Sequence, residues 1–317
     1  MNCIIIINRQ GWVYGRDVMD DLEKFKRAGK IAAEVREESM KLIRIGEKAL
    51  DVANMIERWI LEKGGSIAFP VNISVNNQAA HATPSYNDEY VFGEKDLVTI
   101  DIGVHVDGFV GGDTAYSVDL SGERQILTET SKKALENALS KVKAGVEIGE
   151  IGKEIEETAR QASLRPVENL TGHGLARWQV HTLPSIPNIG NKDKTKLKEG
   201  QIIAIEPFIS NGSGRVREGV RTEIFSFEGK VLTRNRDARK LLDIIYENYK
   251  TLPFAERWLY DYMPELKLKL ALRDLAMRGA IRGYPILKDV EGSFVSQHEV
   301  SLIVEKDSCT LLTPMKF

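Results

Sequence analysis

The segment 97–113, which reads LVTIDIGVHVDGFVGGD, constrains the fold more than any other part of the sequence. Every second residue in its first half is Val or Ile, which is the pattern of a β-strand with one buried face. An Asp-Gly pair follows and favours a tight hairpin, with a returning strand over 109–118. Asp101 lies in the middle of the first strand, and Asp113 on the second strand can face it.

A carboxylate in the middle of a buried strand is unfavourable, because desolvation disfavours its charge. A cation, a metal ion or a cluster of hydrogen-bond donors must compensate. Two interpretations of Asp101 and Asp113 are open at this point. They are either ligands of a metal site, or a pair of carboxylates bonded to backbone amides near the turn.

The composition is that of an ordinary globular protein. The chain has 317 residues, 42% of them hydrophobic and 28% charged, with a formal net charge of −2. This balance gives no reason to expect nucleic acid or a membrane surface as a partner, and no apolar run approaches the ~20 residues of a membrane span. Two cysteines, Cys3 and Cys309, cannot build a disulfide framework. We therefore expect a cytoplasmic protein, and we expect it to be a monomer.

Residues 1–18 stand apart from the rest of the chain. A better helical start follows at Met19, with Asp20 or Asp21 placed to cap it. We treat 1–18 as an N-terminal extension and assign it no function. Beyond it, periodicity predicts helices over 22–43, 48–63, 131–144 and 150–161, and strands over 69–75, 167–173, 201–208 and 292–304.

A weak internal repeat organises these elements into two halves. The segment 51–57 resembles 150–156, and 94–101 resembles 199–206. The order helix, helix, strand, acidic strand therefore occurs twice, and it places Asp101 and Glu206 at equivalent positions within their strands. Two pseudo-symmetric halves would bring these two carboxylates together across a shared axis.

Acidic residues and one histidine in strand-like or glycine-flanked settings form a candidate donor set: Asp101, Asp113, His173, Glu206 and Glu299. Four carboxylates and one imidazole make a hard, anionic set that is rich in oxygen. Such a set suits divalent manganese, iron or cobalt better than a sulfur-ligated structural zinc. Two divalent ions held close together can act on one carbonyl group.

These residues lie in motifs that, in this order, resemble those of type II methionine aminopeptidases in their short archaeal form. The resemblance runs from about Met19 to the C-terminus. Its pieces are FPVNISVNNQAAHATP (69–84), IDIGVHVDGF (100–109), NLTGHG (169–174), SIPN (185–188), AIEPF (204–208), LPFAERWL (252–259) and GYPIL (283–287). The insert that contains LPF looks like type II rather than type I.

The resemblance implies a fold and a set of roles. The fold would be an α+β pita-bread architecture with a catalytic domain over 19–215 and 284–317 and an inserted helical subdomain over 216–283. Two divalent ions, of iron, manganese, cobalt or zinc, would be held by Asp101, Asp113, His173, Glu206 and Glu299. The implied catalytic residues are His81, His181 and Glu206, and the residues that would line the methionine pocket are Phe69, Phe208 and Tyr284.

One spacing departs from this family. Ten residues usually separate its two aspartates, whereas eleven separate Asp101 from Asp113, because Gly111 and Gly112 follow each other here. A slip of one residue turns a side chain to the opposite face of a sheet. We therefore expect a β-bulge at Gly111-Gly112 that keeps Asp113 a ligand. The alternative is a damaged site with one weakened metal.

The implied function is removal of the initiator methionine from nascent proteins with a small second residue, so nascent N-termini would be the partners. Basic residues in the segment 234–283 could face the ribosome, although a solvated helix face explains them more simply. Two rival functions keep the fold: a proline-directed aminopeptidase or creatinase-like hydrolase, and a non-catalytic relative that binds RNA or ribosomes. Relatives of the first kind lack the LPF insert, and those of the second have lost the ligands that this chain retains.

Overall fold

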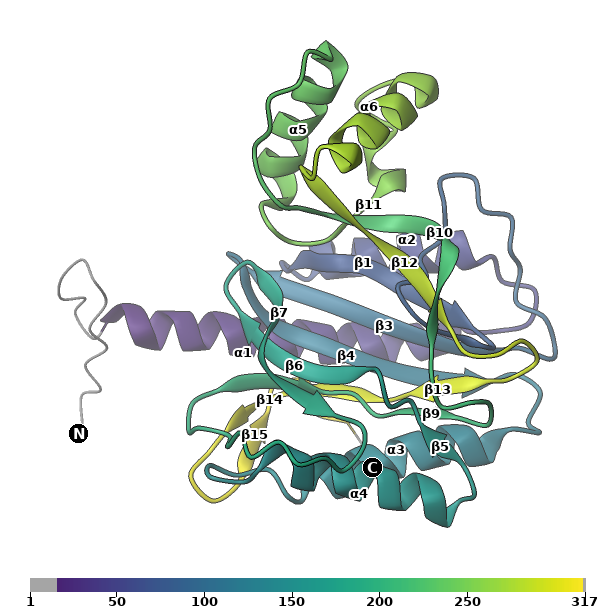
Figure 1. Ribbon diagram of the computed structural model, residues 1–317, viewed down its shortest axis with the longest axis vertical. Helices are drawn as coiled ribbons and strands as arrows, with labels where there is room; N and C mark the ends of the chain where they lie inside the picture. Colours follow the sequence, from purple (N-terminus) through teal and green to yellow (C-terminus); the bar gives the residue numbers. More distant parts are fainter. Residues whose placement is uncertain (1–15, 316–317) are drawn as a thin grey trace.

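An eight-stranded antiparallel sheet forms the centre of the computed structural model, which describes residues 16–315 (Figure 1). Neighbouring strands follow the order β1–β3–β4–β14–β8–β6–β7, and β15 pairs with β14. The strands are β1 (Ser66–Val75), β3 (Leu97–Val106), β4 (Phe109–Asp119), β6 (Thr171–Ala176), β7 (Gln179–Pro187), β8 (Ile202–Ile205), β14 (Glu299–Val304) and β15 (Cys309–Leu311). Within residues 16–315, every helix is too short or too polar to span a lipid bilayer.

Two pairs of helices divide the core of this sheet into halves. They are α1 (Arg16–Ser39) with α2 (Ala49–Glu62), and α3 (Gln125–Leu139) with α4 (Ile148–Gln161). The first pair packs with β1 and β3 in one hydrophobic core, and the second pair packs with β8 and β14 in another. Strands β3 and β8 flank the central β4–β14 pair, with β3 next to β4 and β8 next to β14. The two-half organisation predicted from the repeat is therefore confirmed.

The strand register decides which side chains leave the sheet on the face turned away from these helices. Asp101 pairs with Ala115, and Ala115 pairs with Glu299, so these three residues share a face. The next row contains Ile102 and Val300, which belong to the two helix-covered cores. Hydrophobic burial of the even-numbered residues thus forces the two acids onto the opposite face, where they project together.

A β-bulge on β4 sets the direction of Asp113. Val104 pairs with Gly112 but His105 pairs with Val110, so Gly111 has no cross-strand partner. The bulge returns Asp113 to a position opposite Gly103, on the face that carries Asp101. The predicted bulge is therefore confirmed. A side chain at Gly111 would collide with the backbone of Phe25, and one at Gly112 would lie 2.6 Å from the carbonyl oxygen of Ala28, so α1 leaves room for glycine alone.

The starts of α1 and α3 lie well before the predicted positions 22 and 131. α1 begins at Arg16, so Asp20 and Asp21 lie inside the helix and the predicted cap is wrong. Residues 1–15 of the predicted extension lie outside the described residues. α3 begins at Gln125 rather than at 131, because the Asp119 carboxylate accepts backbone N–H groups of the preceding turn and leads the chain into the helix.

The later strands are shorter than predicted, because loops interrupt them. The predicted strand 201–208 divides into β8 and β9 (Phe208–Ser210), so Glu206 lies just after β8 rather than within a strand. The segment 167–173 contributes to β6 alone, while β5 (Arg165–Pro166) precedes it. The segment 292–304 forms β13 (Val295–Gln297) and β14, separated by His298. Strands β13, β9 and β5 form a small sheet of their own.

The predicted insert contains strands as well as helices. It comprises β10 (Arg217–Phe227), α5 (Arg236–Tyr249), β11 (Phe254–Ala255), the 3₁₀ turn η2 (Glu256–Leu259), α6 (Glu265–Met277) and the start of β12 (Ile281–Lys288). Helices α5 and α6 project at the top of Figure 1 and share one hydrophobic core. Strands β11, β10 and β12 form a four-stranded sheet with β2 (Gln78–Ala80), which pairs with β12 and lies in the first half of the chain. The division at 215/216 and 283/284 stays a prediction.

Candidate metal centre and substrate cavity

All ten residues singled out from the sequence line one cavity of about 620 Å³. Its walls come from the face of the main sheet that is turned away from the helices and from β10 and β12 of the smaller sheet. The ten are the donor set Asp101, Asp113, His173, Glu206 and Glu299, the histidines His81 and His181, and the ring-bearing Phe69, Phe208 and Tyr284. The fold therefore gathers residues from more than 200 positions of sequence around one space.

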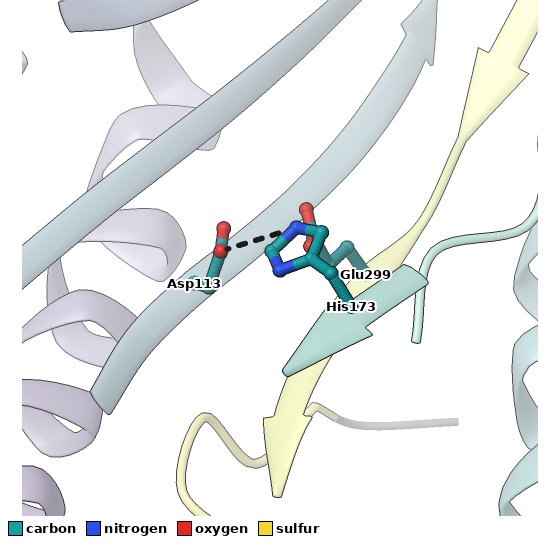
Figure 2. A group of neighbouring side chains, drawn as sticks. All are labelled: Asp113, His173 and Glu299. Carbon is teal, nitrogen blue, oxygen red and sulfur yellow. Dashed lines mark ion pairs between the residues drawn. The ribbon is translucent and has the colours of Figure 1, made fainter. Parts of the chain in front are cut away.

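Three of the expected ligands are close enough to share one ion. Donor atoms of Asp113, His173 and Glu299 all lie within 4.8 Å of one another, and the side chains converge from β4, β6 and β14 (Figure 2). Nε2 of His173 lies 3.8 Å from Oδ2 of Asp113 and 3.4 Å from Oε1 of Glu206. Burial lowers the pKa of His173 to about 3, so its imidazole is neutral and offers a lone pair.

The four carboxylates are wholly or partly buried on one side of the cavity, where they repel one another. Burial raises the pKa of Asp101 to about 7. Burial, and then the charges of neighbouring acids, hold the pKa values of Asp113, Glu206 and Glu299 well above the ordinary range. Four buried acids cannot all ionise without a compensating positive charge.

Two oxygen atoms of this cluster have no hydrogen-bond partner among the described residues. They are Oδ1 of Asp101 and Oε1 of Glu299, both fully buried. A buried oxygen without a donor costs free energy, so a native protein supplies a partner of another kind. Hard carboxylate oxygens and one neutral imidazole are the ligands that divalent manganese, iron, cobalt or zinc accept. The residues present therefore fit a site for divalent cations.

Gln297 connects two of the acids, although no motif in the sequence marks it as part of the site. Its Nε2 donates to Oε2 of Glu206 at 3.0 Å and to Oε2 of Glu299 at 3.3 Å. One amide thereby orients two carboxylates and leaves their other oxygens facing the cluster. Residues 297 and 299 are two positions apart, so a strand would place both side chains on one face, and this spacing could have indicated that Gln297 lies beside Glu299. Its proximity to Glu206 depends on the pairing of β14 with β8, which the sequence does not show.

The two histidines outside the donor set occupy different walls of the cavity. Burial lowers the pKa of His81 to about 4, with a further contribution from His181, so the ring is neutral. Nδ1 of His81 lies 3.3 Å from the carbonyl oxygen of Pro285, which can only accept a hydrogen bond. Nδ1 therefore carries the proton, and Nε2 is left as an acceptor. The ring of His181 packs edge-on against that of His173, with 4.4 Å between centroids.

An aromatic wall adjoins the acidic cluster. Phe208 is almost completely buried and Phe69 is nearly so. Phe69 packs directly over Gly103, where any side chain would collide with its ring. Tyr284 lies edge-on to His81, with 5.4 Å between ring centroids. The cavity thus combines a charged end, where ions fit, with an apolar surface suited to a flexible hydrophobic side chain.

Comparisons with known proteins agree with this arrangement. The model of metallopeptidase family M24 matches residues 23–225. The methionine aminopeptidase of Pyrococcus horikoshii is 47% identical over 294 residues, which are 92% of this chain and 99% of that protein. A solved methionine aminopeptidase of Thermotoga maritima is 23% identical with a TM-score of 0.67 and covers 98% of this chain and 100% of its own. A thermophilic Arx1 is 18% identical with a TM-score of 0.81, over 94% and 92%.

The solved structures share too little sequence with this chain to show more than the fold, and they confirm the pita-bread architecture expected above. The family model and the Pyrococcus relative reach further, because they match by sequence over most of the chain. This chain belongs to metallopeptidase family M24.

Proposed function

We propose that this protein is a methionyl aminopeptidase that removes the N-terminal methionine from nascent polypeptides with a small second residue. The observation that supports it most is the position of a cluster of four acids and one histidine directly beside an aromatic wall. Relatives of this chain at 42–47% identity bear the name methionine aminopeptidase. Initiator methionines arise where proteins are synthesised, so we place the activity in the cytoplasm.

The donor set would hold two divalent ions, of iron, manganese, cobalt or zinc. Its members are Asp101, Asp113, His173, Glu206 and Glu299. Such ions supply Lewis acidity, which polarises the scissile carbonyl and makes water a better nucleophile near neutral pH. Glu206 and Glu299 are kept in place by the amide of Gln297, as their contacts require.

The protein's own side chains would handle the protons and the developing charge. Glu206 would take the proton from the attacking water, because its carboxylate belongs to the cluster that would hold the ions and is ionised once cations balance the charge of that cluster. Neutral His81 accepts the N–H of the substrate amide at Nε2, the ring atom left free by the contact of Nδ1 with Pro285. His181 donates to the carbonyl oxygen as negative charge develops there.

The aromatic wall would select the first residue of the substrate. A methionine side chain is unbranched and polarisable, and its sulfur makes favourable contacts with aromatic rings. Phe69, Phe208 and Tyr284 provide such rings beside the acidic cluster. Binding of the methionine side chain there would place its α-amine and carbonyl group against the ion site.

The nascent chain is the partner in this proposal, and the ribosome is a second, weaker candidate. Basic side chains of the segment 234–283 could approach ribosomal RNA, but several are already paired, as Lys269 is with Glu256 and Arg278 with Asp274. A proline-directed peptidase and a non-catalytic relative are not favoured. Relatives that are 45–47% identical to this chain bear the name methionine aminopeptidase, and an acid or histidine is present at each of the five candidate ligand positions.

Two peptides and a metal analysis test the proposal. The protein loaded with manganese or cobalt is expected to release methionine from Met-Ala-Ser and to leave Ala-Pro-Ser intact. Glu206→Gln is expected to abolish turnover. Metal analysis is expected to give two divalent ions per chain. Cleavage of Ala-Pro-Ser alone would replace the proposed substrate class, and a protein that binds no divalent ion would contradict the proposal as a whole.

A further inference from the structure

Arg282 is the one permanently cationic side chain among the residues that line the cavity. It lies two positions before Tyr284 on β12, so both side chains leave the strand on the same face. Among the described residues its recorded partner is the ring of Tyr284, whose centroid lies 5.5 Å from the guanidinium carbon. No carboxylate of residues 20–315 lies within 4.0 Å of its nitrogens. Its capacity for a bidentate carboxylate contact is therefore unused.

Arg282 lines the cavity and is exposed to solvent, which places it at the mouth of the cavity. Its side chain belongs to an exposed residue, whereas Phe69 and Phe208 at the apolar wall are 9% and 2% exposed. Leu183, which is 85% exposed, lies on the same cavity from β7. A substrate whose methionine reaches the apolar wall must therefore leave past exposed residues such as these.

The field of Arg282 reaches the interior of the cavity as well. After burial, its positive charge is among the causes that lower the pKa values of His81 and His181. Divalent ions bound in the acidic cluster would neutralise the four carboxylates. The positive charge of Arg282 would then have no negative charge to balance it among the residues that line the cavity. An incoming group with negative charge is the natural complement.

We propose that Arg282 gives this protein a preference for substrates with an acidic residue at the third or fourth position, by pairing with that side chain at the cavity mouth. The inference rests on the proposed function. An extended peptide advances roughly 3.3–3.6 Å per residue, so residues beyond the second lie outside the apolar wall and within the reach of a flexible arginine. The pair is partly exposed, so the preference is modest, about two- to fivefold in kcat/KM.

The test uses the metal-loaded full chain and the pentapeptide amides Met-Ala-Xaa-Gly-Gly, with Glu, Gln or Lys as Xaa, and a second set with Xaa moved to the fourth position. C-terminal amides remove the terminal carboxylate. The wild type is expected to prefer Glu over Gln about two- to fivefold in at least one set, and Lys least. The preference is expected to vanish in Arg282→Gln, to reverse in Arg282→Glu, and to shrink in 0.5 M salt.

Lys288→Gln is the matched control, because Lys288 is an exposed basic residue of the same strand outside the cavity. It is expected to keep the preference of the wild type. Equal kcat/KM for Glu, Gln and Lys peptides in the wild type would overturn the inference. So would a uniform loss across all peptides in Arg282→Gln, which would mean that the residue only supports the histidines. A preference seen only for free-acid Met-Ala-Ser over its amide would assign Arg282 to chain termini instead and overturn it for nascent chains.

The two proposals fail in different ways. If the wild type does not release methionine from the neutral Gln peptide under any metal, the proposed function is wrong and this inference falls with it. If the Gln peptide is cleaved and the charge of Xaa has no effect, the proposed function stands and only the role of Arg282 is wrong.

Discussion

The hydroxyl of Ser301 donates a hydrogen bond of 2.6 Å to the carbonyl oxygen of Gly111, the residue without a cross-strand partner in the bulge. The same hydroxyl oxygen accepts the backbone N–H of Asp113 at 3.3 Å. β14 therefore holds both ends of the bulge. Through the bulge it also fixes the direction of the Asp113 carboxylate.

Ser301→Ala is expected to weaken metal binding. The substitution leaves the buried carbonyl of Gly111 without a donor, which costs about 1–3 kcal/mol, and it frees the backbone that aims Asp113. Loss of such a supporting contact lowers metal affinity about 10–100-fold, as metal titration would measure. Ser296→Ala is the control, because its buried hydroxyl lies 2.6 Å from Oγ of Ser131 rather than on the bulge. Equal metal affinity in both variants would contradict the role of Ser301.

Gly111→Ala is expected to destabilise the protein. A Cβ atom at this position would collide with the backbone of Phe25, so either α1 or the bulge must move. Overpacking of this kind costs about 1–3 kcal/mol, measurable as a lower free energy of unfolding in urea. Gly229→Ala is the control, since a Cβ atom there meets nothing within 4 Å. Unchanged stability of Gly111→Ala would mean that α1 does not press on the bulge.

This bulge shows how far the sequence alone could lead. The spacing of Asp101 and Asp113 required an irregularity, and two adjacent glycines gave its position. Its causes could not be predicted, because α1 and Ser301 lie far from the hairpin along the chain. The ten candidate residues were selected through motifs, and all of them line the cavity.

Residues whose role depends on long-range pairing were missed. Gln297 contacts Glu206 only because β14 lies beside β8. Arg282 lines the cavity only because β12 pairs with β10, and this small sheet forms a wall of the cavity. No local pattern distinguishes either residue from an ordinary polar residue on a strand. The start of α3 was misplaced for a local reason, since the turn before it depends on the side chain of Asp119.

Chelation of divalent ions is expected to make stability fall as pH rises. The folded-state pKa of Asp101 is about 7 against an ordinary 3.8, and those of Asp113, Glu206 and Glu299 are also raised. The histidines, whose folded-state pKa values are lowered by burial, oppose this effect below their ordinary value of 6.5. Above about pH 6.5 they are neutral in both states, so the folded chelated protein binds more protons than the unfolded chain. By linkage its free energy of unfolding decreases as pH rises through this window.

Thermal unfolding measures this effect. With a chelator, Tm is expected to fall from about pH 7 to about pH 8.5, where the histidines are neutral in both states. With excess manganese the slope is expected to be shallower, because the ions compensate the ionised carboxylates at higher pH. Identical slopes with and without manganese would show that these acids do not bind the ions.

His81→Ala is expected to lower kcat about 10²-fold with metal content intact. The side chain lines the cavity, but its recorded hydrogen bond is to the carbonyl oxygen of Pro285 rather than to the acidic cluster. Turnover of Met-Ala-Ser and metal analysis of the same sample would check both parts. The control is His105→Asn, because the Nδ1 atom of His105 only accepts the N–H of Gly108 at 3.0 Å and an asparagine oxygen can replace it. Metal loss in His81→Ala would instead make His81 a ligand.

A buried ion pair joins the insert to the first half of the protein. Arg257 in η2 pairs with Glu57 of α2, and it also donates to the hydroxyl of Thr83 at 2.6 Å and the carbonyl of Pro84 at 3.3 Å. Thr83 and Pro84 follow His81 closely in sequence. Burial raises the pKa of Glu57 and the charge of Arg257 opposes this shift. The ion pair therefore anchors the insert to α2, and the other hydrogen bonds of Arg257 hold the loop that carries His81.

Arg257→Met is expected to cost about 3–5 kcal/mol, because it leaves Glu57 buried without its partner, and to lower kcat by releasing that loop. Adding Glu57→Gln removes the unpaired charge and keeps one acceptor oxygen, for either Val71 or Trp258, which donate to different oxygens of Glu57. The double variant is expected to regain part of the stability in urea unfolding. It is not expected to regain kcat, because the donors to Thr83 and Pro84 are still missing. Recovery of both together would mean that the contacts of Arg257 with the loop do not position His81.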